Sequence, residues 1–205
     1  MIKRIIFDLD NTLIPWKPEY TAAIKKATKE YNLPYSPIKI DSLCETYENH
    51  YNKYTIANFQ EHAKKSMNID LPTEFLNTWL KYLGNMSEEN SDINDTLSYL
   101  SKKYELVILT NWFKDSQTER LKTARMCHYF KEIYGGDDFI KPSRESFMQA
   151  IGNHLPSECL MIGDNYKIDI EGAINAGLEA IYLSSSDTTK SVTTIKDLSE
   201  LKNIL

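Results

Sequence analysis

Two aspartates directly follow an apolar run near the start of the chain. Ile5, Ile6 and Phe7 form an unbroken β-favouring run, which is typical of a strand covered on both faces, and Asp8 and Asp10 stand at its carboxyl end. In open parallel α/β sheets, ligands bind outside the carboxyl ends of the strands. Carboxylates at such an edge can act as nucleophile, general acid and base, or metal ligand. The same pattern could also be a simple turn, because Asp is a common turn former.

Polar groups of three further segments fit the same edge. Thr110 and Asp164 are each the first polar residue after an apolar run, Lys141 precedes a proline, and Asp169 follows five residues after Asp164. Because the carboxyl ends of parallel strands share one edge of the sheet, we predict that these residues and the first two aspartates converge in space.

A cluster of carboxylates at one edge needs a counter-charge. Like charges about 4 Å apart cost roughly 4 kcal/mol at an effective dielectric near 20, so Asp8, Asp10, Asp164 and Asp169 together predict a bound divalent cation. Mg²⁺ fits best, because it is typically held by one or two carboxylates while it keeps waters and substrate phosphate oxygens. Lys141 adds a compact cation that can balance a nucleophile or a transferring phosphoryl group.

Alternating strands and helices must position these groups. Hydrophobic periodicity predicts strands at 5–7, 106–109, 160–162 and 180–183, with a short weak strand at 133–134. It also predicts helices at 92–100, 114–126, 143–152, 170–174 and 195–205, and a loop at 184–191. Strands that alternate with single helices imply right-handed crossovers and a parallel sheet.

Residues 15–90 contain no convincing buried strand. Helices are predicted at 20–31, 41–67 and 73–83, separated by proline-containing segments. We therefore predict an all-helical block inserted after the first strand. The polar stretch 50–54 is interpreted as a solvated helix face in preference to a ligand site.

Composition is that of an ordinary globular protein. The 205 residues carry a formal charge of -5 from interleaved acids and bases, which argues against a nucleic-acid or membrane-surface protein. The three scattered cysteines lack metal-binding spacing and are expected to be reduced packing residues, and no signal-peptide-like start is visible. A cytoplasmic location is the default expectation, and the oligomeric state is left open.

The order of the motifs resembles the haloacid dehalogenase (HAD) superfamily of phosphatases and phosphotransferases. The first motif corresponds to residues 7–13, the second to 109–111, the third to Lys141 and Pro142, and the fourth to 163–169. The resemblance implies an α/β fold with a Rossmann-like core, formed by 1–14 and 91–205, and a helical C1-type cap formed by 15–90. Two details depart from the family pattern: a second proline after the lysine is missing, and Asn165 stands where serine is frequent.

Carried over to this chain, the resemblance implies a Mg²⁺-dependent phosphatase acting on a small phosphorylated metabolite. Asp8 would form an aspartyl-phosphate, and Asp10 would serve as general acid and base. Asp8, the backbone carbonyl of Asp10, and Asp164 would hold Mg²⁺, while Asp169 would orient the metal shell or Lys141. The phosphoryl oxygens would bind to three residues: Thr110, Asn111 and Lys141.

The sequence is also compatible with other functions. A dehalogenase or a phosphomutase of the same superfamily is the enzymatic alternative, although Asp10 favours phosphoryl transfer because a departing halide needs no proton. A receiver-like phospho-acceptor and a degenerate binding protein are alternatives of other classes. The substrate is not predicted, but six residues are candidates for contacting its leaving group: Trp16, Lys17, Tyr51, Lys53, Tyr54 and Trp112.

Overall fold

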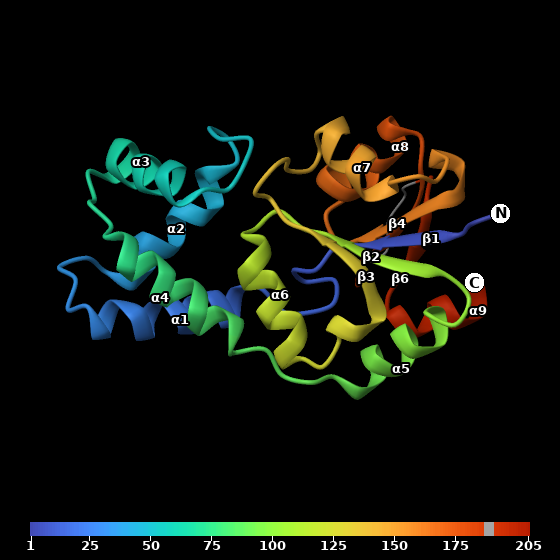
Figure 1. The fold of residues 1–205 in the computed structure, drawn as a ribbon, viewed down its shortest axis with the longest axis horizontal. Coiled ribbons are helices and arrows are strands. Elements are labelled where there is room, and N and C mark those ends of the chain that lie inside the picture. Colours follow the sequence, from blue (N-terminus) through green and yellow to red (C-terminus); the bar gives the residue numbers. More distant parts are fainter. Residues whose placement is uncertain (187–190) are drawn as a thin grey trace.

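A parallel sheet forms the centre of the molecule. The computed structural model describes residues 1–186 and 191–205 (Figure 1). Within them, the sheet has the strand order β3-β2-β1-β4-β5-β6, and all neighbouring strands run parallel. The strands are β1 (Arg4–Phe7), β2 (Glu105–Leu109), β3 (Phe130–Tyr134), β4 (Cys159–Gly163), β5 (Glu179–Leu183) and β6 (Thr193–Ile195). The α-helices are α1 (Lys17–Glu30), α2 (Pro37–Tyr47), α3 (Ile56–Met67), α4 (Thr73–Gly84), α5 (Ser91–Leu100), α6 (Lys114–Thr123), α7 (Arg144–Ile151), α8 (Gly172–Ala176) and α9 (Leu201–Ile204).

Both faces of β1 are buried, as its continuous apolar run predicts. Ile5 and Phe7 point into a cluster that includes residues of α5, α6 and α9, whereas Ile6 points into a second cluster with residues of α7 and α8. Figure 1 shows α7 and α8 above the sheet and α5 and α9 below it. The layered α/β prediction is therefore confirmed, and the strand that carries Asp8 lies inside the core.

Helices α1–α4, here called the helical unit (residues 17–84), lie between β1 and β2 in the chain and stand beside the sheet (Figure 1). They pack around a separate apolar cluster that contains Phe59, Phe75 and Trp79. Trp112 and Phe113, which follow β2, also belong to this cluster. The predicted helical insertion is thus confirmed, while the domain boundaries at 15 and 90 stay a prediction.

Two predicted helices are wrong in part. The region 41–67 is split into α2 and α3 by a non-helical link at 48–55, and the Thr55 side chain caps α3 by accepting a hydrogen bond from the Asn58 backbone N–H at 3.0 Å. The predicted solvated helix face at 50–54 falls in this link. The segment 195–205 begins at the end of strand β6, where Ile195 pairs with Leu183 of β5, and becomes helical only from Leu198.

Smaller differences concern lengths. Strand β3 begins at Phe130, earlier than predicted, and α6 ends at Thr123. The helix predicted at 170–174 starts as a π-helix, Tyr166–Glu171, before α8. Part of the predicted loop 184–191 lies outside the described residues. Among the helices that the structure describes, none is long and apolar enough to cross a membrane.

Candidate active site

The register of the sheet brings three motifs to one edge. Phe7 of β1 pairs with Ile108 of β2 and with Ile162 of β4, so the residues that follow these strands leave the sheet side by side. The backbone N–H of Asp8 donates to the carbonyl of Ile162 at 2.9 Å. The strand ends therefore place Asp8, Thr110 and the loop of Asp164 together, as the sequence predicts.

Lys141 joins this edge from the loop before α7. Its Nζ lies 2.6 Å from Oδ1 of Asp8 and 2.7 Å from Oδ1 of Asp169. The Thr12 hydroxyl donates to the other oxygen of Asp8 at 3.0 Å, and all four side chains are buried. Charge-assisted hydrogen bonds of this kind are short and directional, so the Asp8 carboxylate is held in one orientation.

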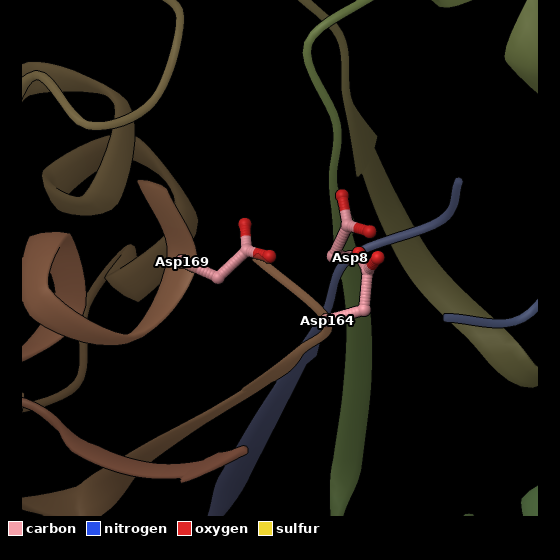
Figure 2. A group of neighbouring side chains, drawn as sticks. All are labelled: Asp8, Asp164 and Asp169. Carbon is pink, nitrogen blue, oxygen red and sulfur yellow. The ribbon is translucent and has the colours of Figure 1, made fainter. Parts of the chain in front are cut away.

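Three carboxylates face one another at the edge of the sheet. Ligand oxygens of Asp8, Asp164 and Asp169 all lie within 4.8 Å of one another, and Figure 2 shows their side chains turned toward a common space. A Cβ at Gly163 would lie 2.6 Å from Cβ of Asp169, so only glycine lets Asp169 approach β4 this closely. This all-oxygen donor set suits a hard divalent cation such as Mg²⁺.

Burial and charge perturb the ionisation of these groups. Burial raises the pKa of Asp8 to about 8, against the opposing effect of Lys141, and burial together with Asp169 raises the pKa of Asp164 to about 6. Burial disfavours the Lys141 ammonium, but Asp169 and Asp8 outweigh it and raise the Lys141 pKa. The 2.6 Å contact favours the Asp8–Lys141 ion pair over two neutral groups. Strongly perturbed groups in a cleft are typical of functional sites.

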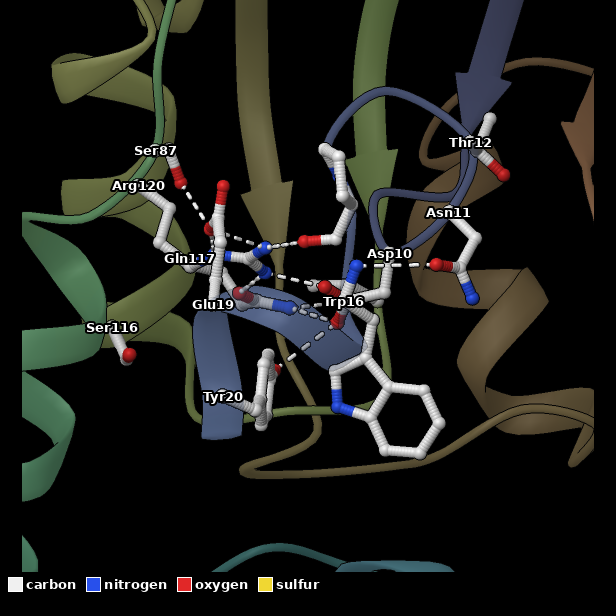
Figure 3. Close-up of polar contacts among 12 residues, drawn as sticks. Asp10, Asn11, Thr12, Trp16, Glu19, Tyr20, Ser87, Ser116, Gln117 and Arg120 are labelled. Atoms are coloured by element: carbon white, nitrogen blue, oxygen red, sulfur yellow. Dashed lines mark hydrogen bonds and ion pairs between the residues drawn. The ribbon is translucent and has the colours of Figure 1, made fainter. Parts of the chain in front are cut away.

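Asp10 occupies a different environment from Asp8. Its Oδ2 accepts hydrogen bonds from Gln117 Nε2 at 2.8 Å and from the Tyr20 hydroxyl at 3.1 Å, and its Oδ1 forms an ion pair with Arg120 (Figure 3). Gln117 Nε2 also donates to Oγ1 of Thr110 at 2.9 Å. The acceptor role of this oxygen leaves the Thr110 O–H free to donate elsewhere.

The side chain of Asn111 fixes the Lys141 loop and reaches the helical unit. Its amide donates to the Lys141 carbonyl at 2.9 Å and accepts from the Lys141 N–H at 2.7 Å, and it also donates to Glu48 at 3.0 Å. Glu48 accepts a second hydrogen bond, from the Tyr54 hydroxyl, at 2.9 Å. Burial raises the pKa of Glu48. A carboxylate of the helical unit therefore lies at the edge of the pocket.

One pocket is lined by residues of both the strand ends and the helical unit. Of the six candidates for contacting a leaving group, three line it: Trp16, Tyr54 and Trp112. The other three do not appear in its lining; Lys17 instead forms ion pairs with Glu45 and Asp41. Residues of the lining that the sequence reasoning missed are Tyr20, Cys44, Glu45 and Glu48.

Gln117 and Arg120, both fully buried on α6, were also missed. A signal for them exists in the sequence. The segment 114–123 contains a single apolar side chain, Leu121, although it follows a buried strand and must pack against the core. Gln117 and Arg120, three residues apart, share one helix face, but a polar face is ordinarily typical of solvent exposure, so this signal alone does not predict their burial.

A comparison with known protein families identifies the family of this chain. A family model described as haloacid dehalogenase-like hydrolase matches residues 5–183, which include all four motifs and the helical unit. The chain belongs to this family.

Named relatives of this HAD-like hydrolase include several phosphatases. The chain is 28% identical to glyceraldehyde 3-phosphate phosphatase of Methanothermobacter thermautotrophicus, with 100% of each chain covered. It is 29% identical to phosphoglycolate phosphatase of Haemophilus influenzae, over 89% of this chain and 85% of the relative.

Solved structures share the fold. Similar folds occur in the HAD-hydrolase YfnB of Bacillus subtilis bound to magnesium (TM-score 0.75, 22% identity, 99% of this chain and 98% of that chain) and in 2-haloacid dehalogenase of Pseudomonas syringae (TM-score 0.76, 23% identity, 100% and 98%).

Proposed function

We propose that this HAD-like hydrolase is a Mg²⁺-dependent phosphatase that hydrolyses a small phosphorylated metabolite through an aspartyl-phosphate. The observation that carries the proposal is the pairing of two carboxylates with different surroundings. Asp8 is buried against Lys141, and Asp10 is turned toward Gln117 and Arg120 at the pocket wall. Two-step hydrolysis of a phosphomonoester uses a nucleophile and a separate group that protonates the leaving oxygen, and Asp8 and Asp10 can fill these two roles.

In the first step, a carboxylate oxygen of Asp8 attacks phosphorus and forms an acyl-phosphate bond. The bond between phosphorus and the leaving oxygen breaks, and Asp10 delivers its proton to that oxygen. Lys141 Nζ, the Thr110 hydroxyl and the backbone N–H of Asn111 bind the phosphoryl oxygens as their charge is redistributed. We assign the backbone of Asn111 because its side chain already holds the Lys141 loop.

In the second step, Asp10 takes a proton from a water molecule that attacks phosphorus. The bond between phosphorus and the Asp8 oxygen breaks, so inorganic phosphate leaves and both aspartates return to their initial states. Hydrogen bonds from Tyr20 and Gln117 keep the Asp10 carboxyl at the pocket wall through both steps.

The carboxylates of Asp8 and Asp164 and the backbone carbonyl of Asp10 are the ligands that we propose for Mg²⁺. When bound, the ion would neutralise charge on the phosphoryl group and orient it. Asp169 would take a supporting role, in which it accepts hydrogen bonds from Lys141 Nζ at 2.7 Å and from the Asn165 N–H at 2.9 Å.

Residues 15–90 are proposed to act as the cap over this edge. Trp16, Tyr54 and Glu48 of this segment line the pocket opposite the strand ends. A cap in this position would exclude water from the acyl-phosphate and contact the leaving group, as lids do in other hydrolases. The phosphatases among the relatives support a small phosphorylated substrate.

Steady-state hydrolysis of p-nitrophenyl phosphate with Mg²⁺ tests the proposal. We expect repeated turnover, complete loss of activity with EDTA that is reversed by added Mg²⁺, and a loss of at least about 10³-fold in Asp8→Asn, because that variant lacks the attacking oxygen. Full activity of Asp8→Asn would contradict the assignment of the nucleophile.

The alternatives give different results in the same assays. A receiver-like protein would take up phosphate once and stop; the observed strand order also argues against it, since receiver sheets follow the order 2-1-3-4-5. A dehalogenase would release halide from a 2-haloacid and leave phosphate esters intact. A phosphomutase would return the phosphoryl group to a second hydroxyl of its substrate and release little inorganic phosphate.

A further inference from the structure

Arg120 of α6 is a fully buried cation in which all five N–H donors have partners. One terminal nitrogen donates to Asp10 and to Gln117 Oε1, the latter at 2.9 Å. The other donates to the carbonyl of Pro15 and to Oε2 of Glu19, both at 2.9 Å, and Nε donates to the same Glu19 oxygen at 3.0 Å. A planar guanidinium with five fixed donors satisfies such a set in one orientation only.

These partners belong to both sides of the junction between the core and the helical unit. Pro15 lies in the connection that leaves the first motif, and Glu19 lies in the first turn of α1. Ser87, in the connection that returns from α4 to α5, donates its hydroxyl to Oε2 of Glu19 at 2.6 Å. The two connections between the core and the helical unit, here called the crossings, therefore meet at the Glu19 carboxylate. Arg120 binds that carboxylate (Figure 3).

Further contacts join α6 to the end of the helical unit. The Thr123 hydroxyl donates to the carbonyl of Gly84 at 2.8 Å, and a Cβ at Gly84 would lie 2.8 Å from Cβ of Glu119. The Tyr20 ring lies 5.3 Å from the Arg120 guanidinium, and its hydroxyl donates to Asp10. Helix α1 thus reaches Asp10 directly through Tyr20 and indirectly through Arg120.

We propose that Arg120 is a positioning residue that couples the orientation of Asp10 to the placement of the helical unit. A shift of the outgoing crossing moves Pro15 and Glu19 relative to α6, and a shift of the returning crossing moves Ser87, which is hydrogen-bonded to Glu19. In either case the guanidinium cannot keep all five hydrogen bonds. The Asp10 carboxyl loses its fixed direction as a result. Proton delivery to the leaving oxygen is therefore fastest when the helical unit sits as described here. This inference rests on the proposed role of Asp10 as general acid.

Glu19→Gln tests the coupling without altering Arg120 or Asp10. The substitution removes the charge that binds Arg120 to the crossings and keeps the size of the side chain. We compare kcat/KM for phenyl phosphate and p-nitrophenyl phosphate, because kcat/KM covers the steps up to departure of the leaving group and phenolate is the poorer leaving group. General acid catalysis contributes about 10²–10⁴-fold, so we expect a loss of about tenfold for phenyl phosphate and less than about threefold for p-nitrophenyl phosphate.

Glu89→Gln is the matched control. Glu89 lies in the same connection as Ser87 and pairs with the exposed Arg125 at 3.2 Å, away from the hydrogen bonds that join Asp10, Arg120 and Glu19. Its two rates should equal those of the wild type. Ser87→Ala provides a second test that keeps the Glu19 charge. We expect a smaller loss of kcat/KM, again greater for phenyl phosphate than for p-nitrophenyl phosphate. This variant tests the coupling if Glu19→Gln does not fold.

The outcomes separate this inference from the proposed function. A wild-type protein that hydrolyses neither ester would overturn the proposed function, and the inference with it. An active wild type whose substrate ratio is unchanged in Glu19→Gln and Ser87→Ala would overturn the coupling alone. Equal losses for both esters would also overturn it, because a purely structural defect lowers both rates together.

Discussion

At the scale of single residues, two aspartates of one short segment have separate environments. Asp8 ends a buried strand and is fixed by Lys141 and Thr12. The chain then turns at Asn11, which adopts a left-handed backbone conformation with φ of 61° and accepts the Trp16 N–H at 3.1 Å. The Asp10 side chain contacts α6 through Gln117 and Arg120. Two identical side chains can therefore perform different chemistry, as in other enzymes with paired carboxylates.

Asp10→Asn should separate the two chemical steps. Asparagine cannot donate or accept the transferred proton, so we expect kcat to fall about 10²–10⁴-fold. With p-nitrophenyl phosphate, whose leaving group needs little help from an acid, the phosphoenzyme should still form and should accumulate because its hydrolysis is slow. Intact-protein mass spectrometry after rapid quenching measures this species. Wild-type kcat in Asp10→Asn would contradict the assignment.

Glu48 should influence which leaving groups are accepted. Its carboxylate lines the pocket beside Glu45, and like charges brought together in a binding site cost affinity. We expect Glu48→Gln to raise kcat/KM for a carboxylated phosphate such as phosphoglycolate about tenfold relative to glycerol phosphate. Glu61→Gln, which alters an exposed ion pair with Lys65 away from the pocket, is the control. An unchanged ratio in Glu48→Gln would reject a role in selectivity.

At the scale of elements, the amino ends of β1 and β2 are joined by charge. Arg4 pairs with Glu105, which also binds Lys131 and lies 3.3 Å from His154. Arg4 further donates to the carbonyl of Ala150 at the end of α7 at 2.6 Å. These contacts fix β1 in register at the end of the sheet opposite the active site.

The Glu105 cluster predicts a loss of stability in acid. Partial burial disfavours the charged carboxylate, but hydrogen bonds from Lys131 and Arg4 outweigh it and lower the Glu105 pKa from 4.5 to about 2. A folded-state pKa below the unfolded value stabilises the fold above about pH 4.5, and this contribution disappears as the pH falls toward 2.

Urea unfolding of wild type and Glu105→Gln measures the effect. The variant should be less stable than the wild type at neutral pH, and the difference should shrink as the pH falls from 4.5 toward 2. A difference in unfolding free energy that stays constant over this range would show that Glu105 is not linked to folding through its charge.

At the scale of the whole molecule, the helical unit and the sheet share an apolar cluster. Trp112 follows β2, yet its ring lies 4.9 Å from Tyr20, 5.0 Å from Tyr54 and 5.7 Å from Trp79 of the helical unit. A backbone hydrogen bond also joins the two parts: the Tyr54 N–H donates to the carbonyl of Gly136 at 2.6 Å. The core therefore completes the packing of the helical unit.

Trp112→Ala should loosen the helical unit more than the sheet. Removing a buried Trp costs about 3–5 kcal/mol, and the lost contacts are mainly with α1, α3 and α4. Hydrogen exchange should accelerate in residues 17–84 before it does in β1, β2 and β4. Phe139→Ala, at an exposed aromatic residue, is the control and should change little. Uniform acceleration throughout the chain would contradict this view.

The sequence alone determined five of the six described strands, the helical insertion and the convergence of Asp8, Thr110, Lys141 and Asp164. Apolar runs report burial directly, and parallel strands bring their carboxyl ends to one edge, so local patterns were sufficient. Only the start of the terminal segment was mistaken for a helix, because the pairing of β6 with β5 depends on a neighbour distant in the chain.

Only the tertiary structure decided the surroundings of Asp10 and the acidic lining of the pocket. Arg120, Gln117 and Glu19 are polar residues of helices, and in sequence such residues are typical of a solvated face. Their burial follows from where α1 and α6 meet, and Glu48 enters the pocket because α2 ends there. Helical periodicity describes one helix at a time, whereas a buried charge is stable only when partners from several segments surround it.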